Sequence, residues 1–148
     1  ILMVAFFVMF FLLALLLVVT AGCGDDGDDP GLAIYAGDFL VTESFSSQDG
    51  VSCGPPPGGT TENGVDVRIK KNQIEFRFET RWGTLYGEIH ESLDFLAVDG
   101  GGKPDLAFEL TGTYSDTDTF AGIIKERTQG CVRIFGAAAG RVVSGEDG

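Results

Sequence analysis

The chain has 148 residues, and its 22 acidic and 10 basic side chains give a formal net charge of −12 at pH 7. This charge argues against nucleic acid and anionic lipid head groups as partners, because both are bound through basic patches. The length suits one domain with a hydrophobic core and a short leader.

The chain begins with an apolar run over residues 1–19 that contains no charged side chain. An apolar run followed by small residues is typical of a secretory signal. An uncleaved membrane anchor is the alternative, since the run has nearly the ~20 residues that span a bilayer core. No Lys or Arg precedes Arg68 and the chain opens with Ile1. We therefore expect the natural start of the signal to differ from the start given.

The apolar run ends in the motif Thr20-Ala21-Gly22-Cys23, which resembles the lipobox of bacterial lipoproteins. Ala21, Gly22 and Cys23 match the family pattern, and Thr20 stands where that family usually has Leu. The resemblance implies a signal peptide over residues 1–22 that is removed during export.

The same resemblance implies that Cys23 becomes the lipidated N-terminus and anchors the protein to the bacterial cell membrane. Stable anchoring needs more than one acyl chain, and the lipid modification of Cys23 would provide them. Lipoproteins with Asp after the lipidated Cys are usually retained in the inner membrane. Gly24 occupies that position here, so the resemblance implies the outer membrane. Cleavage after Ala21 by an ordinary signal peptidase would instead release a free secreted protein.

Residues 23–31 are predicted to be an acidic tether between the lipid and the domain. Four aspartates lie in the run Asp25–Asp29, beside Gly and Pro. Such a run stays hydrated and unstructured. A calcium site is the alternative, but the ligand spacing of a known Ca²⁺ loop is absent.

From residue 32 to residue 143 the dominant signal is a hydrophobic alternation of period two, which predicts β-strands. The expected strands are residues 34–45, 65–70, 74–79, 85–89, 93–98, 106–114, 120–124 and 132–138. The clearest hairpin places Val67 and Phe76 on the buried face, with Arg68 and Glu75 outside. Loops are expected at 46–64 and 99–105, where Gly and Pro are frequent. No helix is expected beyond residue 30, and the polar residues 144–148 are predicted to be a disordered tail.

Eight short strands in one domain predict an all-β fold, a single antiparallel eight-stranded up-and-down barrel, with a β-sandwich as the alternative. Glycines within the predicted strands favour the barrel, because strongly coiled strands need positions without a side chain. These glycines are Gly37, Gly87, Gly112, Gly122, Gly136 and Gly140. The strand count and order resemble lipocalin-like barrels, although Gly37-Asp38-Phe39 replaces the Gly-x-Trp signature of that family.

Two cysteines remain if Cys23 carries lipid, and in an oxidising compartment they predict a disulfide between Cys53 and Cys131. Two unpaired buried thiols are the alternative. The lone His90 is interpreted as a surface residue. Two cysteines and one histidine so far apart in the sequence lack the paired spacing of a zinc site. We expect neither a metal site nor a cofactor.

The sequence contains no linked nucleophile and base, so we expect no enzymatic activity. Two functions remain. The first is a non-enzymatic binding or interaction module at the cell envelope, acting through its loops on an envelope protein partner. The second is a carrier of a small apolar ligand, which the lipocalin-like resemblance implies.

Trp82 is interpreted as part of the core, with the lining of a cavity mouth as the alternative. An eight-stranded barrel is wide enough either to be filled by side chains or to hold one small ligand, so its interior distinguishes the two functions.

Overall fold

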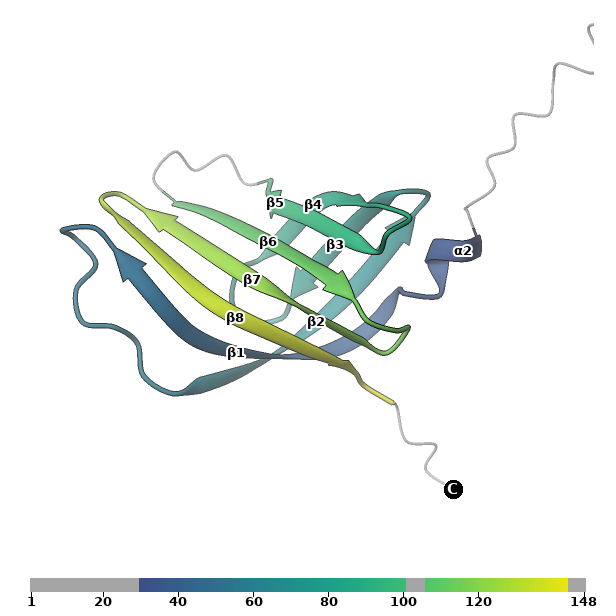
Figure 1. Ribbon diagram of the computed structural model, residues 1–148, viewed down its shortest axis with the longest axis horizontal. Coiled ribbons are helices and arrows are strands. Elements are labelled where there is room, and N and C mark those ends of the chain that lie inside the picture. Colours follow the sequence, from purple (N-terminus) through teal and green to yellow (C-terminus); the bar gives the residue numbers. More distant parts are fainter. Residues whose placement is uncertain (1–29, 101–105, 144–148) are drawn as a thin grey trace, which may run out of the picture.

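A computed structural model of the protein describes residues 30–100 and 106–143, and these form a closed β-barrel (Figure 1). The predicted signal segment, Cys23, most of the tether and the tail lie outside the described residues. The elements in chain order are α2 (Pro30–Ala33), β1 (Gly37–Asp49), β2 (Thr60–Lys70), β3 (Gln73–Phe78), β4 (Thr84–Ile89), β5 (Asp94–Asp99), β6 (Leu106–Tyr114), β7 (Thr119–Thr128) and β8 (Cys131–Arg141). Every strand pairs antiparallel with its neighbours in sequence, and β1 closes the barrel on β8. The predicted up-and-down barrel is confirmed.

The two-residue alternation sets which side chains enter the barrel. In the β2–β3 hairpin, Val67 lies opposite Phe76 and Arg68 lies opposite Glu75. Val67 and Phe76 are at most 1% exposed, whereas Arg68 is exposed on the outer face. This is the arrangement that the sequence predicts, because a register slip of one residue would turn every apolar side chain outward.

Several element bounds differ from the predictions. The expected loop 46–64 is shorter, since β1 continues to Asp49 and β2 begins at Thr60. The last two strands are longer than predicted, and their added residues include Glu126. The residues added to β7 are polar and carry no apolar alternation, whereas those added to β8 include the buried Cys131 and Ala139. All of them pair in register with neighbouring strands. Pairing across the barrel, which periodicity cannot report, therefore extends these strands.

The prediction of no helix beyond residue 30 is wrong by one turn, because Pro30–Ala33 is helical. Pro is favoured at the start of a helix, but one turn is too short to produce a periodic signal. Leu32 of this turn joins the hydrophobic core at 9% exposure. The first strand consequently begins at Gly37 and not at the predicted residue 34.

Aromatic rings fill much of the interior. Neighbouring ring centroids within the central group lie 5.0–6.0 Å apart, in tilted and edge-on arrangements that aromatic pairs favour. The members of this group are Phe39, Phe76, Phe95, Tyr114 and Phe120. Gly112 makes room for them, since a Cβ atom at that position would lie 2.6 Å from Cζ of Phe95. The interior of this half of the barrel is thus occupied by the protein's own side chains.

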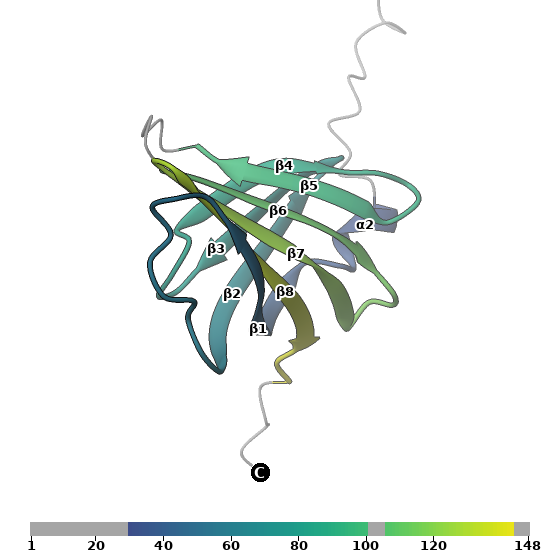
Figure 2. The ribbon, with the colours of Figure 1, turned by 60° about the vertical axis from the view of Figure 1, so that its left-hand side comes forward.

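The barrel has two unlike ends, with α2 on one side and the β1–β2 connection on the other (Figure 1, Figure 2). We call the first the helix end: α2, the starts of β1, β3, β5 and β7, and the ends of the other strands. The opposite end is the disulfide end, which carries the connections β1–β2, β3–β4 and β7–β8.

Within residues 30–100 and 106–143, no helix combines the length and hydropathy needed to cross a membrane.

The helix end is closed by the segment that enters β1. The guanidinium group of Arg141 donates to the carbonyl oxygens of Ala36 at 2.8 Å and Ile34 at 2.9 Å. It also donates to the Asp118 carboxylate at 2.8 Å, which ties the entering segment to the β6–β7 turn. Tyr114 donates its hydroxyl to the Tyr35 carbonyl at 3.1 Å. Burial raises the pKa of the Tyr114 phenol well above its usual range.

Candidate functional site

A disulfide joins Cys53 of the β1–β2 connection to Cys131 at the start of β8, with Cα atoms 4.8 Å apart. The bond is the one expected from the cysteine count, and both residues are buried. Arg133 strengthens the attachment by donating to the Cys53 carbonyl and, at 3.3 Å, to Oε1 of Gln48. The connection is therefore held firmly to the barrel up to Gly54, whose carbonyl accepts from Gln48 at 2.8 Å.

A carboxylate lies inside the barrel at this end. Glu43 is 2% exposed and follows Phe39 and Val41 on the inward face of β1. Its Oε1 accepts from Nε1 of Trp82 at 2.5 Å and from the Asn63 amide at 3.4 Å. Its Oε2 is buried without a hydrogen bond from a described residue. Buried polar atoms nearly always have a partner, so this oxygen marks an unusual site.

Trp82 covers Glu43 from the β3–β4 connection. Its side chain is 4% exposed, and its ring centroid lies 4.9 Å from that of Phe108 and 5.3 Å from that of Phe135. The interpretation of Trp82 as a core residue is confirmed by this burial. Its φ angle is 70°, a conformation that costs energy for a bulky side chain. The indole contacts with Glu43 and the rings hold this conformation in place.

Arg81 lies against the outside of this cluster. Its guanidinium carbon is 3.9 Å from the centroid of the Trp82 ring and 4.7 Å from that of Phe135, which are cation–π distances. Its nitrogens lie 3.7 Å from Oε2 of Glu43 and 3.4 Å from Oε2 of Glu126. Two rings and two carboxylates thus surround one guanidinium group, and we call this set the Arg81 cage.

The Arg81 cage is connected to the disulfide through a chain of polar contacts. Glu126 bridges Arg81 and Arg133, with its Oε1 3.7 Å from Nη1 of Arg133. Arg133 in turn binds the Cys53 carbonyl. The pinned connection and the cage therefore form one polar network across the end of the barrel.

Sequence reasoning did not find this network. Glu43 carries the signal that could have revealed it, since it has the two-residue spacing of the inward-facing Phe39 and Val41. Arg81 carries no comparable signal, because it lies in a connection. Apart from the adjacent Trp82, its neighbours in the cage come from β1, β7 and β8, and only closure of the barrel brings them together.

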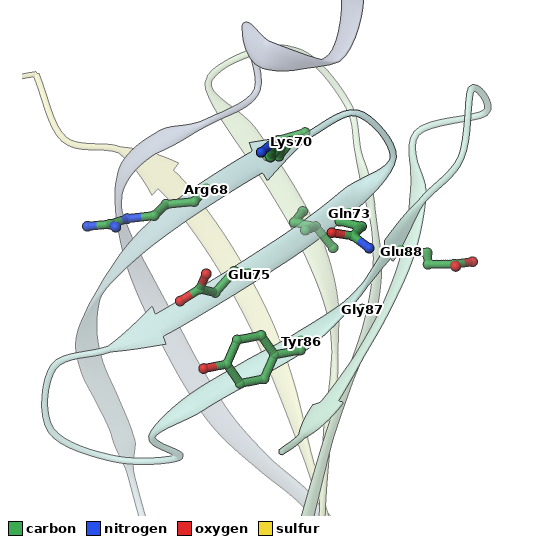
Figure 3. Close-up of a pocket in the computed structure, with 9 residues that line it drawn as sticks. Arg68, Lys70, Gln73, Glu75, Tyr86, Gly87 and Glu88 are labelled. Carbon is green, nitrogen blue, oxygen red and sulfur yellow. The ribbon is translucent and has the colours of Figure 1, made fainter. Parts of the chain in front are cut away.

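A hollow of about 530 Å³ opens on the outer face of β2, β3 and β4 (Figure 3). Six outward side chains form two cross-strand rows around it: Arg68, Glu75 and Tyr86 in the first, and Lys70, Gln73 and Glu88 in the second. Arg68 is paired with Asp66, and Glu75 with Arg77, along their own strands. The hydrogen bond that Arg77 donates to the Glu75 carboxylate raises the pKa of the exposed Arg77 guanidinium. This open, mixed-charge hollow can receive a polar group but does not enclose one.

The remaining predicted positions lie apart from these features. His90 is exposed at the turn between β4 and β5, as expected for a surface histidine. Its neighbour Asp94 accepts from the hydroxyls of Thr113 at 2.5 Å and Ser92 at 3.0 Å, and these bonds lower the pKa of the Asp94 carboxyl. Among the described residues, no group of three or more His, Cys, Asp or Glu side chains is arranged to hold a metal ion.

Comparison with known proteins supports the fold. The architecture defines a class, the closed eight-stranded antiparallel barrel. A similar solved structure is the monomer form of the M. tuberculosis PknI sensor domain, with a TM-score of 0.50 and 13% sequence identity. The match covers 72% of this chain and 86% of that one. No protein-family model matches the sequence, and no curated protein matches it.

Proposed function

We propose that this protein is an exported lipoprotein, anchored through Cys23, whose barrel is a non-enzymatic module that binds a partner at the cell envelope. The observation that carries the binding role is a closed, filled barrel whose charged network lies at one end. The anchor is inferred from the lipobox-like motif.

The closed barrel limits how a partner can bind. Every described strand has two neighbours, so no strand edge is open to an added strand. The packed aromatic interior favours an interaction module over a carrier of an apolar ligand, since the space that such a ligand needs is taken by Phe76, Phe95 and Phe120. A partner would therefore bind through side chains on the outside or at an end.

The position of the entering segment suggests which end is available. Only residues 24–29 separate Cys23 from Pro30, and α2 lies at the helix end. A lipid on Cys23 would hold the helix end toward the membrane and direct the disulfide end away from it. The disulfide supports an oxidising, exported location. The structure of similar fold is named a sensor domain, and a sensor role would suit the proposed binding module.

The anchor can be tested by metabolic labelling with a palmitate analogue. We expect label on the wild-type protein and none on Cys23→Ser, because the thiol is the acylated group. Intact mass of the purified protein should show loss of residues 1–22 together with acylation. Membrane fractionation would then test the outer-membrane assignment. An unlabelled wild type would rule out the lipoprotein proposal.

The binding role can be tested separately by photo-cross-linking in cells. A cross-linking amino acid at Val51, which is fully exposed on the disulfide end, should capture a defined protein partner. The matched position is Ile34, 55% exposed at the helix end, where we expect no capture of that partner. Equal capture from both positions would contradict the proposed orientation.

A further inference from the structure

We propose that the Arg81 cage is a binding site for a guanidinium group, and that Arg81 occupies it in the absence of a ligand. This inference rests on the proposed role as a binding module and names the chemistry of what it binds. The ligand would take the place of the Arg81 side chain between the rings and the carboxylates.

The cage has the chemistry that a guanidinium group requires. Trp82 and Phe135 provide two ring faces, and the carboxylates of Glu43 and Glu126 provide acceptors on its edge. Planar guanidinium groups stack on aromatic rings and pair with carboxylates, and they are more weakly hydrated than an ammonium group. The Glu43 carboxylate is buried, so the site is desolvated before any ligand arrives.

Arg81 fills this cage incompletely. Charge-assisted N–H···O bonds are normally about 2.7–2.9 Å long. The distances from Arg81 to Glu126 and Glu43 are 3.4 Å and 3.7 Å, and Oε2 of Glu43 lacks a hydrogen bond from any described residue. A guanidinium group that is free of the β3–β4 connection could approach this oxygen closely. The unsatisfied oxygen thus points to an occupant other than Arg81.

Arg81 is also the member of the cage that can leave. Its side chain is 36% exposed, against 1% for Glu43 and 12% for Glu126. The connection that carries it holds Trp82 at φ 70° and Gly83 at φ 66°. Departure of Arg81 would remove the ion pair of the Glu43 carboxylate and leave Glu126 paired with Arg133. The net charge of −12 would attract a cationic ligand toward the protein.

The experiment uses the protein as purified from cells and Trp82, the only tryptophan in the chain, as a fluorescence probe. Methylguanidinium is titrated over about 1–20 mM, the range in which a single small cation is expected to bind. In Arg81→Ala we expect a saturable fluorescence change and a higher melting temperature. In the wild type we expect the affinity for methylguanidinium to be lower by at least about tenfold, because the tethered Arg81 competes at high effective concentration.

Two variants serve as controls. Glu43→Gln/Arg81→Ala removes the charge but keeps an acceptor for Trp82, and should lose the binding seen in Arg81→Ala. Arg77→Ala removes an exposed arginine on the outer face and should behave as the wild type. If Arg81→Ala does not fold, Arg81→Met retains the apolar stem over the indole and takes its place.

Absence of saturable binding to the Arg81 variants, or equal binding by the double variant or the wild type, would overturn the site. The peptide Gly-Arg-Gly amide then distinguishes two sources of the guanidinium group. Tighter binding than methylguanidinium supports an arginine of a partner protein, and equal binding supports a small guanidinium compound. The titration needs no lipid or cellular partner, so its failure would leave the palmitate and cross-linking results unaffected.

Discussion

The two ends of this barrel are closed by different kinds of side chains. At the helix end, Leu32 and a group of aromatic rings close the interior, and Arg141 secures the segment above them. At the disulfide end, the interior contains Glu43 and is closed by Trp82 and Arg81. Burial of apolar rings stabilises a fold without directional requirements, whereas a buried carboxylate is stable only with specific partners. The helix end is therefore stabilised by apolar burial, whereas the disulfide end depends on specific polar contacts, which are those of the proposed binding site.

The largest loss of stability is expected from a change in the aromatic core. Phe76→Asp would bury a carboxylate among the rings of Phe95 and Phe120, and should cost about 5 kcal/mol, close to the whole unfolding free energy of a small domain. The matched change Gln73→Asp, on the outward face of the same strand, should stay within about 0.5 kcal/mol. Thermal unfolding of the two variants measures the difference. Equal melting temperatures would contradict the inward and outward assignment.

A smaller but more local effect is expected from the disulfide. The double variant Cys53→Ser/Cys131→Ser should lose about 2–4 kcal/mol of unfolding free energy in urea, because the reduced chain gains freedom in its unfolded state. Amide hydrogen exchange should increase first in the β1–β2 connection and the start of β8. Faster exchange that began equally at the helix end would show that the two ends are not separately held.

Variants of Glu43 test whether the disulfide end depends on the hydrogen bonds to the buried carboxylate. Glu43→Ala leaves the Trp82 indole N–H and the Asn63 amide without their acceptor, and should cost about 1–3 kcal/mol. Glu43→Gln retains an acceptor for the indole, so it should cost less. Urea unfolding, followed by Trp82 fluorescence, gives both values. Equal losses for Gln and Ala would mean that the charge, which both variants remove, and not hydrogen bonding, dominates at this site.

The smallest effect concerns the helix end and depends on pH. Tyr114→Phe removes one hydrogen bond and should cost about 1 kcal/mol at pH 7. Burial raises the pKa of Tyr114 in the folded state, so the unfolded state loses this proton first as the pH rises above about 10. The wild type should therefore lose stability above that pH, and the difference from Tyr114→Phe should shrink. Urea unfolding at pH 7 and pH 11 measures the change; a difference that grew with pH would contradict the buried, neutral phenol.

The fold was predictable from the sequence because its information is local. Alternation of apolar and polar residues places Val67 and Phe76 inside without reference to any other strand. The pair of Cys53 and Cys131 was expected from counting cysteines, on the premise that Cys23 carries lipid and the chain is exported. A strand that alternates in this way must bury one face, and eight such strands in a single domain can do so by closing on themselves.

The charged network was decided only by the tertiary structure. Arg81 lies 38 residues from Glu43 and 45 from Glu126 along the chain, and nothing in its own neighbourhood marks it. The three residues meet because β1 pairs with β8, β8 pairs with β7, and the β3–β4 connection folds over their ends. Local alternation determines which face a side chain occupies. The pairing register around the closed barrel determines which distant side chains share its end, and a sequence pattern of period two does not specify that register.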